Sequence, residues 1–89
     1  MRHMYYLYVI QHSETQEVYI GKTNDLKRRL KEHNAGEQIA THRISGEWKV
    51  VYTEVYRAKS DADKRELRLK QHGRAKQELL KRLKSSLFF

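Results

Sequence analysis

Two short runs of aromatic and β-branched residues stand near the start of the chain: YYLYVI at residues 5–10 and VYIG at residues 18–21. Residues of these types favour β-strands. The segment between the runs includes HSETQE, which is polar and typical of a turn. The pattern therefore predicts a β-hairpin over residues 5–21.

The rest of the chain alternates helix and strand signals. Thr23, Asn24 and Asp25 can cap a helix that runs to about His33, where αL-tolerant residues follow. A loop is predicted at residues 36–47, followed by a strand, WKVVYTEVY, at 48–56. A second helix is opened by a loose capping box at Ser60–Asp63 and is broken at Gly73. The third helix has Ala75, Leu79, Leu80 and Leu83 on one face.

This order, β-β-α-β-α-α, predicts a small α+β domain with a three-stranded, mostly antiparallel sheet flanked by helices. The 89 residues contain no proline and four glycines, and no linker divides them. We therefore expect one domain over residues 1–89, with its core at about 4–84 and a tail at 85–89 that is either frayed or docked.

The charge of the chain is strongly positive. Nineteen Lys and Arg residues against eleven Asp and Glu residues give a formal net charge of +8. Residues 57–84 hold eleven of the basic and four of the acidic side chains, so most of the excess lies in the C-terminal helices. Such an excess favours a polyanionic partner, since each neutralised phosphate releases counterions. The alternative is a basic protein whose charge serves only solubility.

Two absences narrow the classes of protein. There is no cysteine, so neither disulfides nor zinc thiolates hold the fold, which accords with a cytoplasmic location. No secretory signal is visible, and the apolar run at the N-terminus is too short to span a bilayer. We therefore expect no membrane association.

Strand alternation places two tyrosines together. With a four-residue turn from His12 to Thr15, Tyr8 lies directly opposite Tyr19, on the more polar face of the hairpin with Gly21. Gly21 then leaves room for an approaching group. The alternative is an aromatic pair that only stabilises the sheet, by about 0.2–1 kcal/mol. The opposite face is the expected core face, with Tyr5, Leu7, Val9, Val18 and Ile20.

The first predicted helix has its buried stripe at Leu26 and Leu30. Arg29 and His33 fall on the flank of that stripe, four residues apart, and are neighbours at the edge of the core. The other basic residues of the helix point well away: Lys27, Arg28 and Lys31. Packing therefore holds Arg29 in place, whereas its neighbour is solvated.

Glu66 occupies an inward position in the second predicted helix, because Ala62, Glu66, Leu69 and Gly73 recur at helical spacing. A carboxylate at such a position is costly unless it is paired, hydrogen-bonded or bound to a metal. A salt bridge with one of the many basic residues and a ligand role both satisfy the pattern.

These residues occur together in one known family. The sequence resembles the GIY-YIG nuclease superfamily over roughly residues 4–84, and is similar to its short stand-alone members. The resemblance rests on Tyr6-Leu7-Tyr8, Tyr19-Ile20-Gly21, the run YIGKTNDLKRRLKEHN with Arg29 and His33, and Glu66 in KREL.

The resemblance implies a metal-dependent endonuclease that hydrolyses phosphodiester bonds, with DNA favoured over RNA and a role in repair or structure processing. Glu66 would bind one divalent ion, Mg²⁺ or Mn²⁺. Arg29 would hold the non-bridging oxygens of the phosphate. Tyr8 would take a proton from water or orient the water, with Tyr19 and His33 in support.

Nucleic-acid contacts and departures from the family pattern complete the comparison. Lys22 and Arg43 are candidates for contacts to phosphates. Tyr6 stands where the family has glycine, which leaves less room beside Tyr8. The loop ATHRISGEW differs from the usual Thr-Arg-Gly-rich stretch, and the SSLFF tail has no counterpart of an asparagine found in some relatives.

Two other classes of function stay open. In one, the chain keeps the fold and binds nucleic acid but has lost useful turnover. In the other, it is a basic domain that binds a protein partner through an apolar contact at Leu87, Phe88 and Phe89.

Overall fold

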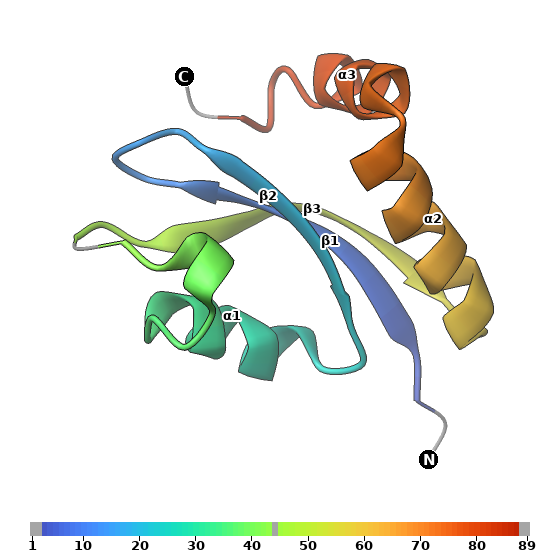
Figure 1. Ribbon diagram of the computed structural model, residues 1–89, viewed down its shortest axis with the longest axis horizontal. Coiled ribbons are helices and arrows are strands. Elements are labelled where there is room, and N and C mark those ends of the chain that lie inside the picture. Colours follow the sequence, from blue (N-terminus) through green and yellow to red (C-terminus); the bar gives the residue numbers. More distant parts are fainter. Residues whose placement is uncertain (1–2, 44, 88–89) are drawn as a thin grey trace.

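The computed structural model describes residues 3–43 and 45–87. The predicted order of elements is confirmed, and the protein is a small α+β domain (Figure 1). The elements are β1 (Tyr5–His12), β2 (Val18–Thr23), α1 (Leu26–Asn34), the short 3₁₀ helix η1 (Ile39–Thr41), β3 (Trp48–Tyr56), α2 (Lys59–Gln71) and α3 (Gly73–Arg82).

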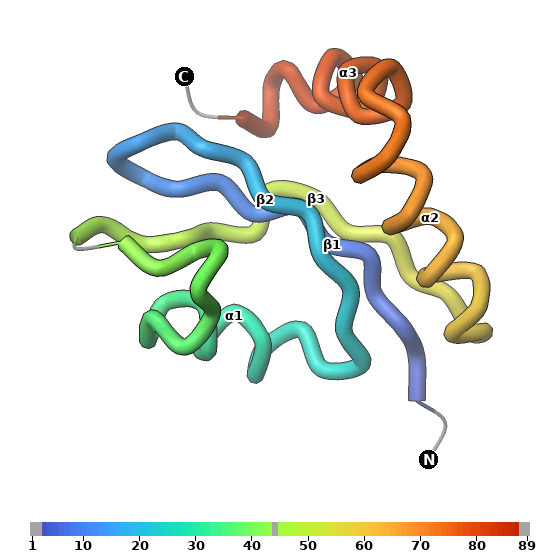
Figure 2. The backbone as a smooth tube through the Cα atoms, viewed as in Figure 1, coloured from blue at the N-terminus to red at the C-terminus, as the bar shows by residue number. Residues whose placement is uncertain are grey.

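The three strands form one antiparallel sheet in the order β2-β1-β3. Helix α1 lies on one side of the sheet, and α2 and α3 lie on the other (Figures 1 and 2). The central strand β1 is therefore covered on both faces and is buried from Leu7 to His12. Strand β2 is an edge strand, which leaves one side of its backbone open beside α2.

Each face of the sheet packs a buried cluster, whereas strand alternation predicted one core face and a more polar face with Tyr8 and Tyr19. Towards α2 and α3 the buried cluster is Leu7, Val9, Ile20, Leu69, Leu79 and Leu83, with Leu87 packed against it. Towards α1 it is Tyr8, Ile10 and Trp48, with Tyr19, Leu26 and Leu30 packed against it.

The register of the hairpin differs from the prediction. Tyr8 lies opposite Gly21, and Tyr19 lies opposite Ile10. The cause is a turn of the predicted length that lies one residue later in the chain: the His12 amide donates to the Glu17 carbonyl, and the His12 ring accepts hydrogen bonds from two backbone amides of the turn, so β1 extends to His12. The shift is two residues, an even number, so each side chain stays on its predicted face.

The helix termini follow the predictions in part. Asp25 caps α1 by accepting a hydrogen bond from the Arg28 amide at 3.0 Å, as expected. The capping box at Ser60 is wrong, because α2 starts at Lys59 after Ala58 and has no side-chain cap. The break near Gly73 is confirmed, since α2 ends at Gln71 and α3 begins at Gly73.

A polar cluster joins α2 to β3. Arg65 binds the Glu54 carboxylate through Nε and Nη2 at 2.9 to 3.2 Å. The hydroxyls of Tyr52 and Tyr56 donate to the same carboxylate at 2.7 and 2.5 Å. These four side chains satisfy one another's hydrogen-bonding groups and join β3 to α2, the helix that also carries Glu66.

Part of the predicted tail lies outside the described residues, namely Phe88 and Phe89.

Within residues 3–43 and 45–87, none of the helices combines the length and the apolar character needed to cross a membrane.

Candidate functional site: a tyrosine, histidine, arginine and glutamate cluster

The cluster begins with Tyr8, whose ring lies against the backbone of Gly21 on the neighbouring strand. A Cβ atom at Gly21 would lie 2.5 Å from the Tyr8 hydroxyl oxygen and 3.1 Å from the Tyr19 ring. Tyr8 is only 2% exposed. The predicted open space at Gly21 is therefore wrong: the Tyr8 phenol itself occupies it.

His33 joins the two tyrosines to helix α1. Its Nε2 atom lies 2.7 Å from the Tyr8 hydroxyl, and its ring makes edge contacts with Tyr8 and Tyr19, with centroids 5.7 and 5.2 Å apart. Its Nδ1 atom lies 2.6 Å from Oγ1 of Thr41. Burial, helped by the positive charge of Arg29, lowers the pKa of His33 below its usual 6.5, so the ring is neutral at pH 7.

Arg29 lies one turn before His33 on α1 and is partly buried, as predicted. Its Nε atom is 3.2 Å from a carboxylate oxygen of Glu32, but this approach is not a hydrogen bond, and the buried Nε has no hydrogen-bond partner in the described part of the chain. The neighbouring Arg28 is more exposed, at 54% against 30%. The Nε–H donor of Arg29 is thus unused, and the charge of Arg29 lowers the pKa of Tyr8.

Glu66 lies on α2, which packs beside β2. Its side chain is 20% exposed and lies 3.4 Å from the Lys70 ammonium, one turn further along the helix. Lys70 also lies over the Tyr19 ring, 5.1 Å from its centroid. Of the two alternatives for the inward Glu66, the structure contains the salt bridge, with Lys70 as the partner. A metal-ligand role for Glu66 stays a prediction.

The pKa of Tyr8 responds to several charged residues of the candidate site. Burial raises the pKa of Tyr8 well above 10, and the charges of Tyr19, Glu66 and Glu32 raise it further, whereas the charge of Arg29 opposes them. Tyr8, Tyr19 and His33 are in direct contact, and the charges of Arg29 and Glu66 act on Tyr8. The Tyr8 hydroxyl is protonated at neutral pH.

Three members of the cluster were missed by sequence reasoning. Glu32 and Lys70 pair with predicted residues at i+3 and i+4 spacing, a signal that the sequence does contain. Thr41 lies in an irregular loop, and no local periodicity marks it.

The two candidate nucleic-acid contacts are engaged within the protein. Lys22 is paired with Asp63 of α2. Arg43 binds the Glu17 carboxylate with two nitrogens, at 2.9 and 2.5 Å, and lies over the Trp48 ring. A contact from either residue to a phosphate stays a prediction, and the structure gives each cation another partner.

The fit of a metal depends on Glu66 alone. No group of three His, Cys, Asp or Glu side chains gathers as a ready metal site within residues 3–43 and 45–87. Magnesium commonly keeps several waters and binds one or two carboxylates together with substrate phosphate oxygens. The single carboxylate of Glu66 fits such a largely hydrated ion, but no all-protein cage.

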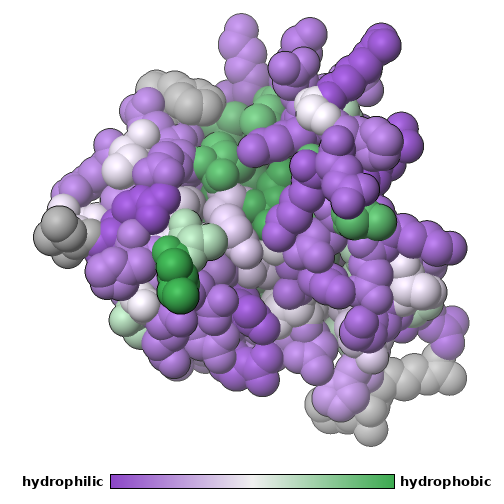
Figure 3. Space-filling model, in the orientation of Figure 1, coloured by the Kyte–Doolittle hydropathy of each residue, from purple (hydrophilic) through white to green (hydrophobic). Residues whose placement is uncertain are grey.

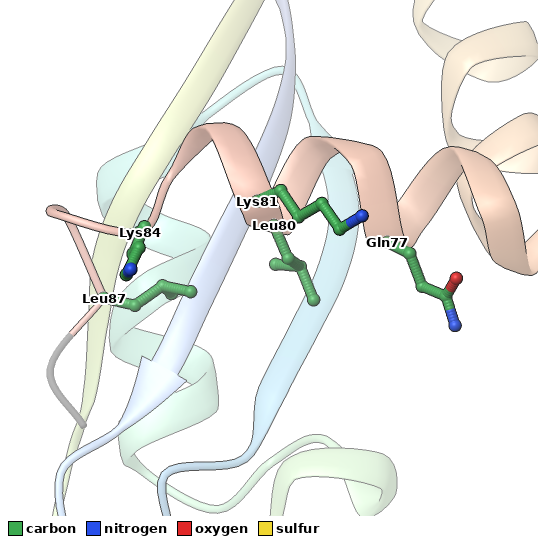
Figure 4. Close-up of a pocket in the computed structure, with 5 residues that line it drawn as sticks. All are labelled: Gln77, Leu80, Lys81, Lys84 and Leu87. Carbon is green, nitrogen blue, oxygen red and sulfur yellow. The ribbon is translucent and has the colours of Figure 1, made fainter.

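A separate groove of about 510 Å³ lies along α3 and is lined by Gln77, Leu80, Lys81, Lys84 and Leu87 (Figure 4). Figure 3 shows that hydrophobic surface gathers between α3 and the sheet, within an otherwise mostly hydrophilic face. The lining offers no carboxylate, imidazole or hydroxyl, so this groove is not the reactive site.

Comparison with known proteins agrees with this geometry. The sequence matches the GIY-YIG catalytic domain over residues 4–80. The chain therefore belongs to the GIY-YIG family, whose domain is a nuclease fold.

The relatives are UPF0213 proteins, a small single-domain GIY-YIG family. A UPF0213 protein of Halobacterium salinarum is 40% identical, covering 86% of this chain and 99% of the relative. One from Bacillus pumilus is 33% identical, covering 88% and 79%. The solution NMR structure of a UPF0213 protein from Bacillus halodurans has a TM-score of 0.55 and 31% identity, covering 91% and 85%.

Proposed function

We propose that the protein is a divalent-metal-dependent endonuclease that hydrolyses phosphodiester bonds in nucleic acid, with DNA favoured over RNA and a role in repair or structure processing. The observation that carries the proposal is the 2.7 Å hydrogen bond between the Tyr8 hydroxyl and Nε2 of His33. A guanidinium and a carboxylate complete the set of groups that such a hydrolysis needs.

Tyr8 and His33 together serve as the base. Because the Tyr8 pKa is raised, chiefly by burial, a free phenolate is not populated at neutral pH. The Tyr8 oxygen takes the proton of the attacking water as it passes its own proton to Nε2 of His33. The His33 ring is neutral beforehand and accepts that proton, so charge and protons balance.

Arg29 and Glu66 act on the phosphate. The guanidinium of Arg29, whose Nε has no hydrogen-bond partner among the described residues, binds the non-bridging oxygens, for which its planar shape is well suited. Glu66 would hold one Mg²⁺ or Mn²⁺, and such an ion, when bound, stabilises negative charge on the phosphate and the departing 3′-oxygen. Its present partner Lys70 is 45% exposed and 3.4 Å away, an ion pair weak enough to exchange.

We place the nucleic-acid backbone at the edge of β2, beside Tyr19. A pocket of about 180 Å³ at the edge of β2 is lined by Tyr19, Lys70 and Lys76 together with apolar residues. Lys76 has no ion-pair partner in the part of the chain that the structure describes. The pocket therefore offers positive charge next to a tyrosine of the cluster, and we place a backbone phosphate flanking the scissile one there.

A second candidate function is a nucleic-acid-binding module without useful turnover. The 2% exposure of Tyr8 favours it, because an attacking water must reach a hydroxyl that is almost fully covered. The ion pair that occupies Glu66 points the same way.

Cleavage of a labelled panel tests the proposal: single-stranded, duplex, nicked and branched DNA, and RNA, with Mg²⁺ or Mn²⁺ and with EDTA. Arg29→Ala is the test variant, and Arg28→Ala is its matched control on the exposed side of the same helix. We expect metal-dependent cutting that falls by about 10²-fold or more in Arg29→Ala and stays near wild type in Arg28→Ala.

The outcomes separate the two functions. Cutting that is equal in both arginine variants would refute the assigned role of Arg29. Salt-sensitive binding with no cutting of any substrate would support the binding module. Binding that is absent or insensitive to salt would exclude both and favour a protein partner.

A further inference from the structure

Thr41 closes the far side of the Tyr8–His33 pair. It is the last residue of η1 and is completely buried, with 0% exposure. Its hydroxyl lies 2.6 Å from Nδ1 of His33 and 3.5 Å from the carbonyl of Gln38. Tyr8, His33, Thr41 and the Gln38 carbonyl thus form a continuous hydrogen-bonded chain through the protein.

Only one direction of this chain gives every hydrogen an acceptor. Tyr8 is 2% exposed, and its hydroxyl has His33 Nε2 as its sole hydrogen-bond partner within residues 3–43 and 45–87. Tyr8 must therefore donate to Nε2, so Nδ1 carries the ring hydrogen and donates to Thr41. Thr41 in turn donates to the Gln38 carbonyl. In the reverse direction the Tyr8 hydrogen would lack an acceptor.

The protein holds Thr41 firmly in this place. The indole nitrogen of Trp48 donates to the Thr41 carbonyl at 2.8 Å. The Asn34 side chain binds the backbone of Trp48: it donates to the Trp48 carbonyl at 3.1 Å and accepts from the Trp48 amide at 2.6 Å. Asn34 is adjacent to His33 on α1, so these hydrogen bonds hold Thr41 in a fixed position relative to His33.

We propose that Thr41 is a positioning residue that selects the His33 tautomer with the hydrogen on Nδ1, which leaves Nε2 free to take a proton from Tyr8. The proposal rests on the proposed function for its catalytic consequence, but the tautomer itself is a property of the folded protein. Without the Thr41 hydroxyl, the Nδ1 hydrogen loses its buried acceptor, so the preference for this tautomer, which Tyr8 also supports, becomes smaller.

Histidine ring ¹⁵N NMR of the full chain, with Thr41→Val and Thr41→Ser, tests the tautomer. Valine matches the shape of threonine and lacks the hydroxyl, whereas serine keeps it. We expect the Nδ1–H form in wild type and Thr41→Ser, and a larger share of the Nε2–H form in Thr41→Val. His12 is an internal control: its Nδ1 accepts from the amides of Glu14 and Thr15 at 3.3 and 3.1 Å, which dictates the opposite tautomer.

Turnover gives the second readout. We expect kcat of Thr41→Val to fall by about 10-fold to 100-fold, a part of what general base catalysis supplies. KM should stay unchanged, and Thr41→Ser should restore kcat. A wild-type spectrum with the hydrogen on Nε2 of His33 would overturn the proposal without any variant, and so would an unchanged tautomer in a folded Thr41→Val protein. A wild-type protein that never cuts, but shows the expected spectra, would refute the nuclease and leave the tautomer assignment standing.

Discussion

Replacing Gly21 by alanine tests whether the Tyr8 ring is packed over the β2 backbone as described. The added Cβ would lie 2.5 Å from the Tyr8 hydroxyl oxygen and 2.6 Å from Cζ. These separations are well inside the roughly 3.5–4.0 Å at which non-bonded atoms attract. Tyr8 is buried and hydrogen-bonded to His33, so the ring cannot swing aside without breaking that bond.

The size of the effect follows from these two terms. Overpacking of a core costs about 1–3 kcal/mol, and loss of the Tyr8–His33 hydrogen bond adds about 0.5–1.5 kcal/mol. We expect the free energy of unfolding to fall by about 2–4 kcal/mol, which for a domain of this size lowers Tm by roughly 10–30 °C.

Urea and thermal unfolding followed by circular dichroism measure this change. The matched control is Gly73→Ala, because a Cβ at Gly73 meets nothing within 4 Å. This control should leave stability unchanged or raise it by about 0.4–1 kcal/mol. A Gly21→Ala protein that melts together with wild type would refute the packing of Tyr8 over residue 21, and with it the geometry of the site.

Three further predictions concern pH, an ion pair and salt. Burial lowers the pKa of His33, so below pH 6.5 the unfolded chain binds a proton at this residue more readily than the folded chain does. The free energy of unfolding should therefore fall as the pH drops from 7 to 5. It should fall less steeply in His33→Gln. Burial raises the pKa of Glu54, but hydrogen bonds from Arg65 and two tyrosines outweigh it and hold the pKa below 4.5. The stability that Glu54 supplies should therefore be present above pH 4.5 and be lost as the pH falls through the folded pKa, and Glu54→Gln should cost about 1–3 kcal/mol at pH 7 by urea unfolding. Lys76→Gln should reduce the slope of the logarithm of the binding constant against the logarithm of the salt concentration by about 0.7–0.9, measured by fluorescence anisotropy on labelled DNA. The control Lys49→Gln, on the opposite edge strand, should leave this slope unchanged. Equal slopes in the two variants would exclude a phosphate in the pocket.

The regular elements and the faces of the strands could be read from the sequence because their signals are local. Alternation placed Tyr8 and Tyr19 on one face of the sheet, and helical spacing placed Arg29 beside His33. The strand over residues 48–56 was predicted with its observed bounds. Each of these inferences depends only on neighbours along the chain.

The register of the hairpin could not be read in this way. It depends on how the turn satisfies its backbone amides, and here the ring of His12 accepts hydrogen bonds from two of them and the turn lies one residue later than predicted. The same limit applies to Lys22 and Arg43, whose partners Asp63 and Glu17 lie far away in sequence. Charge alone does not reveal whether a cation is already paired.

The sequence by itself predicted the residues of the candidate site, from periodic positions and from the family resemblance: two tyrosines, an arginine, a histidine and a glutamate. The tertiary structure alone decided how they are connected. Thr41 reaches His33 from an irregular loop, and Gly21 matters because a ring from the next strand fills its place. The physical reason is that secondary structure follows local periodicity, whereas hydrogen-bond direction and close packing depend on segments that only folding brings together.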